Sequence, residues 1–313
     1  MRAAWPAAPE RDWTNPTSKT TSKFFRGRGD RSRRATSTPN EMMAQPQPAA
    51  LAVQLRESLW LAASSTRAWI CHTAPSSTGE ITASAVRSLL DGALATAIRL
   101  HAGHLPPSPP LTPRRWIWRL VGYYHLTHST TALLELAAER FAAAGQLELA
   151  GWAQTRAREE DQHDRLALRD LRAMGVDPLR AIAALGPHPT ERLVAWFRAS
   201  VLAADPIGCV GYAYAVERLA LEVGAAELAA VAAMLPDGVR ATRCMRVHSR
   251  IGSDANHVDE TIELITELSP TRREAIARAV FEVACLCATP PPDGYPDDAA
   301  IARRLIGSHE LQP

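Results

Sequence analysis

The chain has 313 residues, of which 46% are apolar and 22% are charged, so it can bury a sizeable hydrophobic core. Its net charge is +2, but residues 1–40 hold nine basic and three acidic side chains, so the other 273 residues carry a net charge of −4. That larger part gives no electrostatic case for a nucleic-acid partner, and no apolar run reaches the ~18–20 residues of a membrane span.

Residues 1–48 are rich in Arg, Ser, Thr, Pro and Gly, a composition that cannot bury enough apolar area to order itself. We therefore expect a disordered basic extension. Residues 49–105 read as a pair of helices, 49–72 and 80–104, interrupted by the Pro75–Gly79 segment. A proline-rich connector, 106–113, then either separates this pair from the rest or runs across its surface.

Residues 114–290 are dominated by strong helix formers and show no sustained period-two alternation. Capping signals mark several helix starts, at Thr190, at Asp205-Pro206 and at Ser269-Pro270. The fold class expected is all-α, an antiparallel bundle of about six to eight helices, followed by a C-terminal tail at 291–313. The expected helices cover residues 114–144, with a kink near Ser129, then 146–174, 190–203, 206–234, 238–268 and 270 to about 287.

Glu160 and His163 lie among the apolar positions of the expected helix 146–174. Their Glu-x-x-His spacing lets one turn of helix offer two ligands to a metal. The alternative is structural: Glu160 pairs with Arg156, and His163 is a hydrogen-bonded core histidine.

Glu217 is centred on the apolar stripe of the expected helix 206–234, with Tyr214 one turn away. A salt bridge to Arg218 or Arg243 is the structural alternative.

Asp254 and His257 share one face of the expected helix 238–268, with Arg250 one turn before them. His248 falls on the opposite side of a regular helix, although a bulge or break at Gly252 would swing it round. The structural alternatives are a charge pair between Asp254 and Arg250 and a hydrogen-bonded His257.

Five polar groups on core-facing stripes would repel and desolvate one another unless cations held them. Carboxylates and imidazoles without a thiolate suit iron or manganese better than a closed structural zinc site. We therefore predict a metal centre with Glu160, His163, Glu217, Asp254 and His257 as catalytic ligands and His248 as a further ligand. Arg250 and Tyr214 are candidate substrate or charge partners.

At residues 114–288 the pattern resembles the haem-oxygenase-like diiron oxidases and oxygenases, the iron-containing redox enzymes. The likeness is carried by Glu160-x-x-His163, by the segment Gly211–Glu217 and by Asp254-x-x-His257. The resemblance implies two ferrous ions, or one if a ligand is lost, with manganese as another metal, and dioxygen activation to oxidise a fatty acid, amino acid or amine. Arg250 stands where the family has its first histidine of the third ligand helix, which puts one metal position in doubt.

Three other readings stay open. The first two are cofactor-free enzymes on the same fold, a thiaminase-II-like one using Cys209 with Glu217 or a quinone-synthase-like one. The third is a non-catalytic helical binding protein with a degenerate metal site. Five scattered cysteines without a CxxC pair, and an N-terminus without an apolar signal segment, predict a cytoplasmic protein. The expected partners are a small-molecule substrate and dioxygen, without nucleic acid or membrane. A homodimer is one candidate assembly, and the sequence does not choose the oligomeric state.

Overall fold

The computed structural model describes residues 51–55, 58–62, 69–73, 81–102, 108–186, 188–252, 255–291 and 293–307. The chain divides into two compact units, with residues 51–73 in the first and residues 81–307 in the second. The disordered extension expected over residues 1–48 lies outside the described residues.

The described part of the first unit is a three-stranded antiparallel sheet. Its strands β1 (Leu51–Leu55), β2 (Ser58–Ala62) and β3 (Trp69–Thr73) pair in chain order, with Leu55 opposite Ser58 and Ser58 opposite Thr73. The helix predicted over residues 49–72 is therefore wrong. Segments of five residues are too short for their apolar period to separate a strand from a helix, and here strand pairing decided the outcome.

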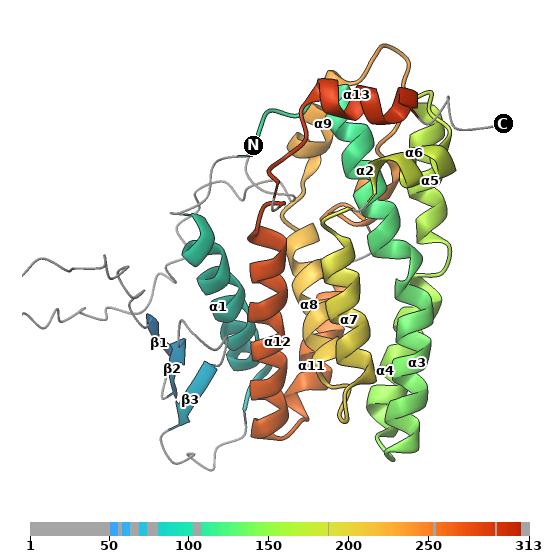
Figure 1. Ribbon diagram of the computed structural model, residues 1–313. Coiled ribbons are helices and arrows are strands. Elements are labelled where there is room, and N and C mark those ends of the chain that lie inside the picture. The colour runs from blue at the N-terminus through green and yellow to red at the C-terminus, as the bar shows by residue number, and fades with distance from the viewer. Residues whose placement is uncertain are drawn as a thin grey trace, which may run out of the picture. The chain divides into compact units, whose positions relative to one another are not determined.

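The second unit is all-helical, as predicted (Figure 1). Its helices are α1 (Ala83–Ala102), α2 (Pro113–His128), α3 (Thr130–Ala143), α4 (Leu147–Glu159), α5 (His163–Ala173), α6 (Pro178–Leu185), α7 (Glu191–Leu202), α8 (Gly208–Ala220), α9 (Ala225–Met234), α10 (Arg243–Val247), α11 (Ala255–Thr266), α12 (Pro270–Ala288) and α13 (Asp298–Gly307).

These helices are shorter and more numerous than the six to eight expected. Each of four predicted long helices is broken, giving the pairs α2 and α3, α4 and α5, α8 and α9, and α10 and α11. The kink expected near Ser129 is one of these breaks. Helix α6 was not predicted, and α13 occupies residues that the sequence assigned to a tail, where Ile301 is fully buried.

Helix α12 packs against α1 on one side and α8 on the other, and these helices run side by side in Figure 1. A Cβ on Gly211 of α8 would lie 2.6 Å from both the Ala279 Cβ and the Ile276 carbonyl oxygen of α12, so only glycine allows this close approach. Since α1 packs within the same unit as α12, it is part of the bundle rather than half of a separate helical pair.

A second group of contacts forms the core at the end of the bundle where α2, α5, α6, α10 and α13 meet. Trp116 is fully buried there, and its indole Nε1 donates to the Ala241 carbonyl oxygen at 2.8 Å. This core fixes helices α5 and α10, which carry two of the predicted metal ligands at their ends. None of the described helices combines the length and apolarity that crossing a membrane requires.

Candidate metal centre

The sequence predicted that Glu160 and His163 lie on one continuous helix, and this prediction is wrong. Helix α4 ends at Glu159 with Glu160 as its C-cap, and α5 begins at His163. Between them Gln162 adopts a left-handed backbone, with φ of 66°, which turns the chain sharply. The turn still brings the two side chains together, with His163 Nδ1 2.9 Å from Glu160 Oε2.

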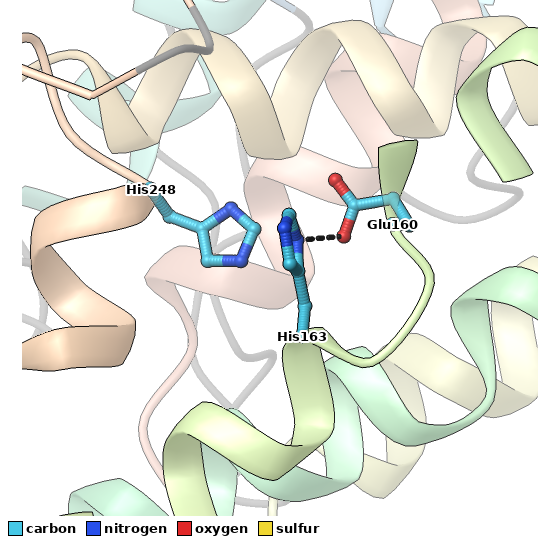
Figure 2. A group of neighbouring side chains, drawn as sticks. All are labelled: Glu160, His163 and His248. Carbon is cyan, nitrogen blue, oxygen red and sulfur yellow. Dashed lines mark hydrogen bonds and ion pairs between the residues drawn. The ribbon is translucent and has the colours of Figure 1, made fainter. Parts of the chain in front are cut away.

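His248 completes a cluster with these two residues (Figure 2). It is the C-cap of α10, where the chain leaves the helix, and its ring meets that of His163 edge-on with centroids 4.8 Å apart. One ligand atom from each of Glu160, His163 and His248 lies within 4.8 Å of the others. The sequence allowed either a regular helix or a break near Gly252. The structure has the break, which turns His248 towards the cluster.

A buried carboxylate holds the two histidine-bearing helices in register. Asp170 of α5 is fully buried, and it accepts hydrogen bonds from Arg243 Nη1 at 2.9 Å and from the Cys244 backbone N–H at 3.0 Å. Both donors lie in the first turn of α10, so Asp170 clamps α5 to α10. Burial raises the pKa of Asp170, while its hydrogen bonds to Cys244 and Arg243 oppose that shift.

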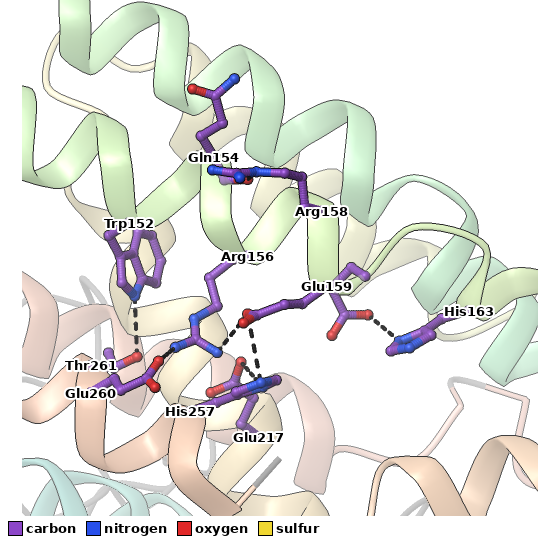
Figure 3. Close-up of polar contacts among 11 residues, drawn as sticks. Trp152, Gln154, Arg156, Arg158, Glu159, His163, Glu217, His257, Glu260 and Thr261 are labelled. Atoms are coloured by element: carbon purple, nitrogen blue, oxygen red, sulfur yellow. Dashed lines mark hydrogen bonds and ion pairs between the residues drawn. The ribbon is translucent and has the colours of Figure 1, made fainter. Parts of the chain in front are cut away.

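Glu217 and His257 form a second group (Figure 3). His257 Nδ1 lies 4.0 Å from Glu217 Oε1, and His257 Nε2 lies 3.5 Å from Glu159 Oε2. Glu159 in turn accepts a hydrogen bond from Arg156 Nη1 at 2.9 Å, and Arg156 also pairs with Glu260 of α11. The two nitrogens of His257 thus face different carboxylates, one of which is tied to a buried arginine.

The two groups open on one pocket. Glu160, Glu217 and His248 line it together with Arg156, and the space amounts to about 650 Å³ with its open mouth included. Most of the remaining wall is apolar or aromatic: Tyr123, Leu126, Leu134, Phe197, Tyr212, Ala213, Val216 and Ala220. Burial raises the pKa of Tyr123 to about 12 and also raises that of Tyr212, so both phenols stay protonated at neutral pH.

One predicted site residue is untested, and two others lie away from the cluster. Asp254 lies outside the described residues. Arg250 is exposed, and its Nε donates to the Leu221 carbonyl oxygen at 3.0 Å, so it caps the end of α8 and does not face the cluster. The hydroxyl of Tyr214 donates to Asp91 Oδ1 of α1 at 2.9 Å, which makes it a link between helices rather than a substrate partner.

The donor set suits a metal ion. Two imidazoles and one carboxylate within reach of one another form the set of ligands that non-haem Fe(II) oxygenases and catalytic zinc sites use with open positions. The side chains are shielded, with 17% of His163, 13% of Glu160, 10% of His257 and 12% of Glu217 exposed. Glu217 lines the same pocket, and with the neighbouring His257 it offers a second carboxylate and a further imidazole. The residues therefore fit one metal position directly and supply donors for another.

Sequence reasoning missed Glu159 and Asp170. Glu159 does not lie on the apolar stripe of its predicted helix, so the helical period did not mark it as a site residue. Its role depends on the contact between α4 and α11. Trp152 Nε1 donates to Thr261 Oγ1 at 3.2 Å across that same contact. Asp170 could have been found from the sequence, because it is a charged residue on the side of its helix that is buried.

Comparison with known proteins gives little beyond a general likeness. No family model and no curated protein matches the sequence. Among solved structures, a domain of unknown function with a heme oxygenase-like fold from Shewanella denitrificans is similar with a TM-score of 0.48 and 20% identity, covering 72% of this chain and 89% of its own. A TenA homolog from Pseudomonas syringae pv. tomato is similar with a TM-score of 0.48 and 13% identity, covering 75% of this chain and all of its own.

Proposed function

We propose that the protein is a non-haem iron oxidase or oxygenase of the haem-oxygenase-like kind, which activates dioxygen to oxidise a small organic substrate. The observation that carries the proposal is the placement of Glu160, His163 and His248, whose ligand atoms lie within 4.8 Å of one another beside an apolar pocket. A metal bound there would supply the redox chemistry that amino-acid side chains lack.

The protein's own residues have separate tasks in this proposal. Glu160, His163 and His248 hold the first metal, and Glu217 and His257 hold a second, to which Asp254 is the remaining candidate ligand. The Nε2–H of His257 would donate to the Glu159 carboxylate, 3.5 Å away, so that the Nδ1 lone pair is presented to the metal on the side of Glu217. The apolar wall receives the carbon skeleton of the substrate and keeps bulk water from the cluster.

The position of Cys209 counts against a thiaminase-II-like mechanism. The side chain is fully buried in α8, and it is not among the residues that line the described pocket. Burial raises the pKa of the thiol, and the nearby Asp205 carboxylate raises it further, so the thiolate needed for nucleophilic attack is suppressed. The general fold is shared by both readings, and the contents of the pocket favour the metal.

Anaerobic titration with ferrous iron tests the proposal. We expect tight binding of two iron ions per chain, and an absorbance change after an oxygen pulse that follows the iron content. His163→Ala should lower the bound iron while leaving the helical circular dichroism intact. His128→Ala is the matched control, because His128 is exposed and pairs with Asp164 outside the cluster. A wild-type protein that binds no iron overturns the proposal.

A further inference from the structure

Tyr212 places a phenol in the wall of the pocket that Glu160 and His248 also line. Its side chain is 3% exposed, and its hydroxyl is buried without a hydrogen-bond partner among the described residues. Burial raises the pKa of this phenol, and Cys287 and then Glu160 raise it further. A buried hydroxyl without a partner costs about 1–3 kcal/mol, so its presence calls for an explanation.

The ring is held firmly. It stacks in parallel on Phe197, with centroids 4.1 Å apart and planes 4° apart, and it also stacks with Trp196, with centroids 6.3 Å apart. The indole of Trp196 is itself fixed by a hydrogen bond to Glu282 Oε2 at 3.1 Å. The hydroxyl therefore has a fixed position from which it cannot swing to find another acceptor.

Tyr214, two residues further along α8, shows the ordinary arrangement. It is also fully buried, and its hydroxyl donates to a carboxylate, Asp91 Oδ1, at 2.9 Å. The same helix thus carries one buried phenol that is satisfied within the fold and one that is not. The difference is that Tyr212 lines the pocket and Tyr214 does not.

We propose that the Tyr212 hydroxyl binds the non-protein ligand of the metal centre, donating a hydrogen bond to an anionic oxygen or nitrogen held at an open coordination position. This inference rests on the proposed metal centre, and it names the kind of group that the site takes: an acceptor, not a donor. A protonated phenol has one O–H to donate, and the group that receives it must be an acceptor.

Azide is a suitable probe, because it is a small anion that binds ferric iron and can be followed by absorbance. Wild type, Tyr212→Phe and Tyr214→Phe are each loaded with iron, the iron is counted, and azide is then titrated. For Tyr212→Phe we expect unchanged iron content, unfolding at an unchanged or higher denaturant concentration, and azide affinity lower by about tenfold, the size of one hydrogen bond. For Tyr214→Phe we expect lower stability and unchanged azide affinity.

Each other outcome overturns a definite statement. Equal azide affinity in wild type and Tyr212→Phe overturns the role of Tyr212 and leaves the metal centre standing. Lower iron affinity in Tyr212→Phe shows that the hydroxyl orients Glu160 instead, and lower stability shows that it has a structural partner. Absence of iron from the wild type, seen before azide is added, overturns the proposed function and this inference together.

Discussion

Glu159 connects a buried arginine to a predicted metal ligand, and its role can be tested at the level of a single charge. Replacing it with glutamine keeps the shape but removes the carboxylate that faces His257 Nε2. Loss of such a partner typically lowers metal affinity by about 10- to 100-fold, and we expect Glu159→Gln to do so in a ferrous titration. Glu148→Gln is the control, since Glu148 is an exposed glutamate in the first turn of the same helix. Equal iron affinity in the two variants would show that Glu159 serves only Arg156.

His248 and Arg250 are two residues apart, and the structure gives them opposite roles. His248 belongs to the cluster, while Arg250 is exposed and caps α8. We expect His248→Ala to lower the iron stoichiometry by at least one ion per chain. Arg250→Ala should keep the full iron content and lose only a modest amount of stability, about 1 kcal/mol for one hydrogen bond. Metal analysis of the purified variants measures the iron bound per chain. If His248→Ala binds as much iron as the wild type, this histidine is not a ligand.

At the scale of the elements, the break after α10 decides where His248 points. A Cβ on Gly252 would lie 2.0 Å from the Val247 carbonyl oxygen, a backbone atom that cannot move without displacing the turn. We expect Gly252→Ala to lower the free energy of unfolding by about 1–3 kcal/mol, as forced backbone shifts do, and to weaken iron binding as well.

Gly151 provides the contrast for that substitution. It lies inside α4, and an added Cβ would meet nothing within 4 Å. Gly151→Ala should therefore raise the stability by about 0.5–1 kcal/mol, the ordinary gain of alanine over glycine in a helix. Urea denaturation of both variants measures the effect, and a Gly252→Ala protein as stable and as metal-competent as wild type would refute the importance of the tight turn.

At the scale of the whole molecule, stability should depend on pH through His188. This histidine is 5% exposed, with its Nε2 3.1 Å from the Trp118 carbonyl oxygen, and the Thr190 backbone N–H donates to its Nδ1. Burial, together with the charge of the neighbouring His125, lowers its pKa to about 3. Below pH 6.5 the unfolded chain binds a proton at this residue and the folded chain does not. Stability therefore decreases as pH falls from 6.5 towards 3, by up to about 1.4 kcal/mol per pH unit.

Urea unfolding of wild type and His188→Gln between pH 7.5 and 5 measures this contribution. We expect the variant to be less stable at pH 7.5, because it loses the packing of the imidazole, but to show a shallower decline below pH 6.5. Other titrating groups are common to both proteins and cancel in the difference. Parallel curves for the two proteins would mean that His188 binds a proton equally well in the folded and unfolded states.

The sequence by itself determined the helical class of residues 81–307 and identified most of the side chains that the structure brings together. Helix starts such as Ser269-Pro270 could be predicted from the local sequence, because capping residues and prolines act within one turn of the helix. Glu160, His163, Glu217 and His257 were recognised because a polar group on an apolar stripe is visible in the sequence alone.

Only the tertiary structure decided which of these groups meet. The turns at Gln162 and Gly252 interrupt helices that the sequence predicted as continuous. The second turn is tied to the segment after α8, because the Arg250 backbone N–H donates to the Val223 carbonyl oxygen at 3.0 Å, and the local sequence does not show such a contact. Those turns bring His163 and His248 to Glu160, and they leave Arg250 on the surface. The contact of α4 with α11 likewise gives Glu159 its position beside His257. Residues far apart in the chain become neighbours through the burial of helix faces, and a helical period shows which face is buried without showing what lies against it.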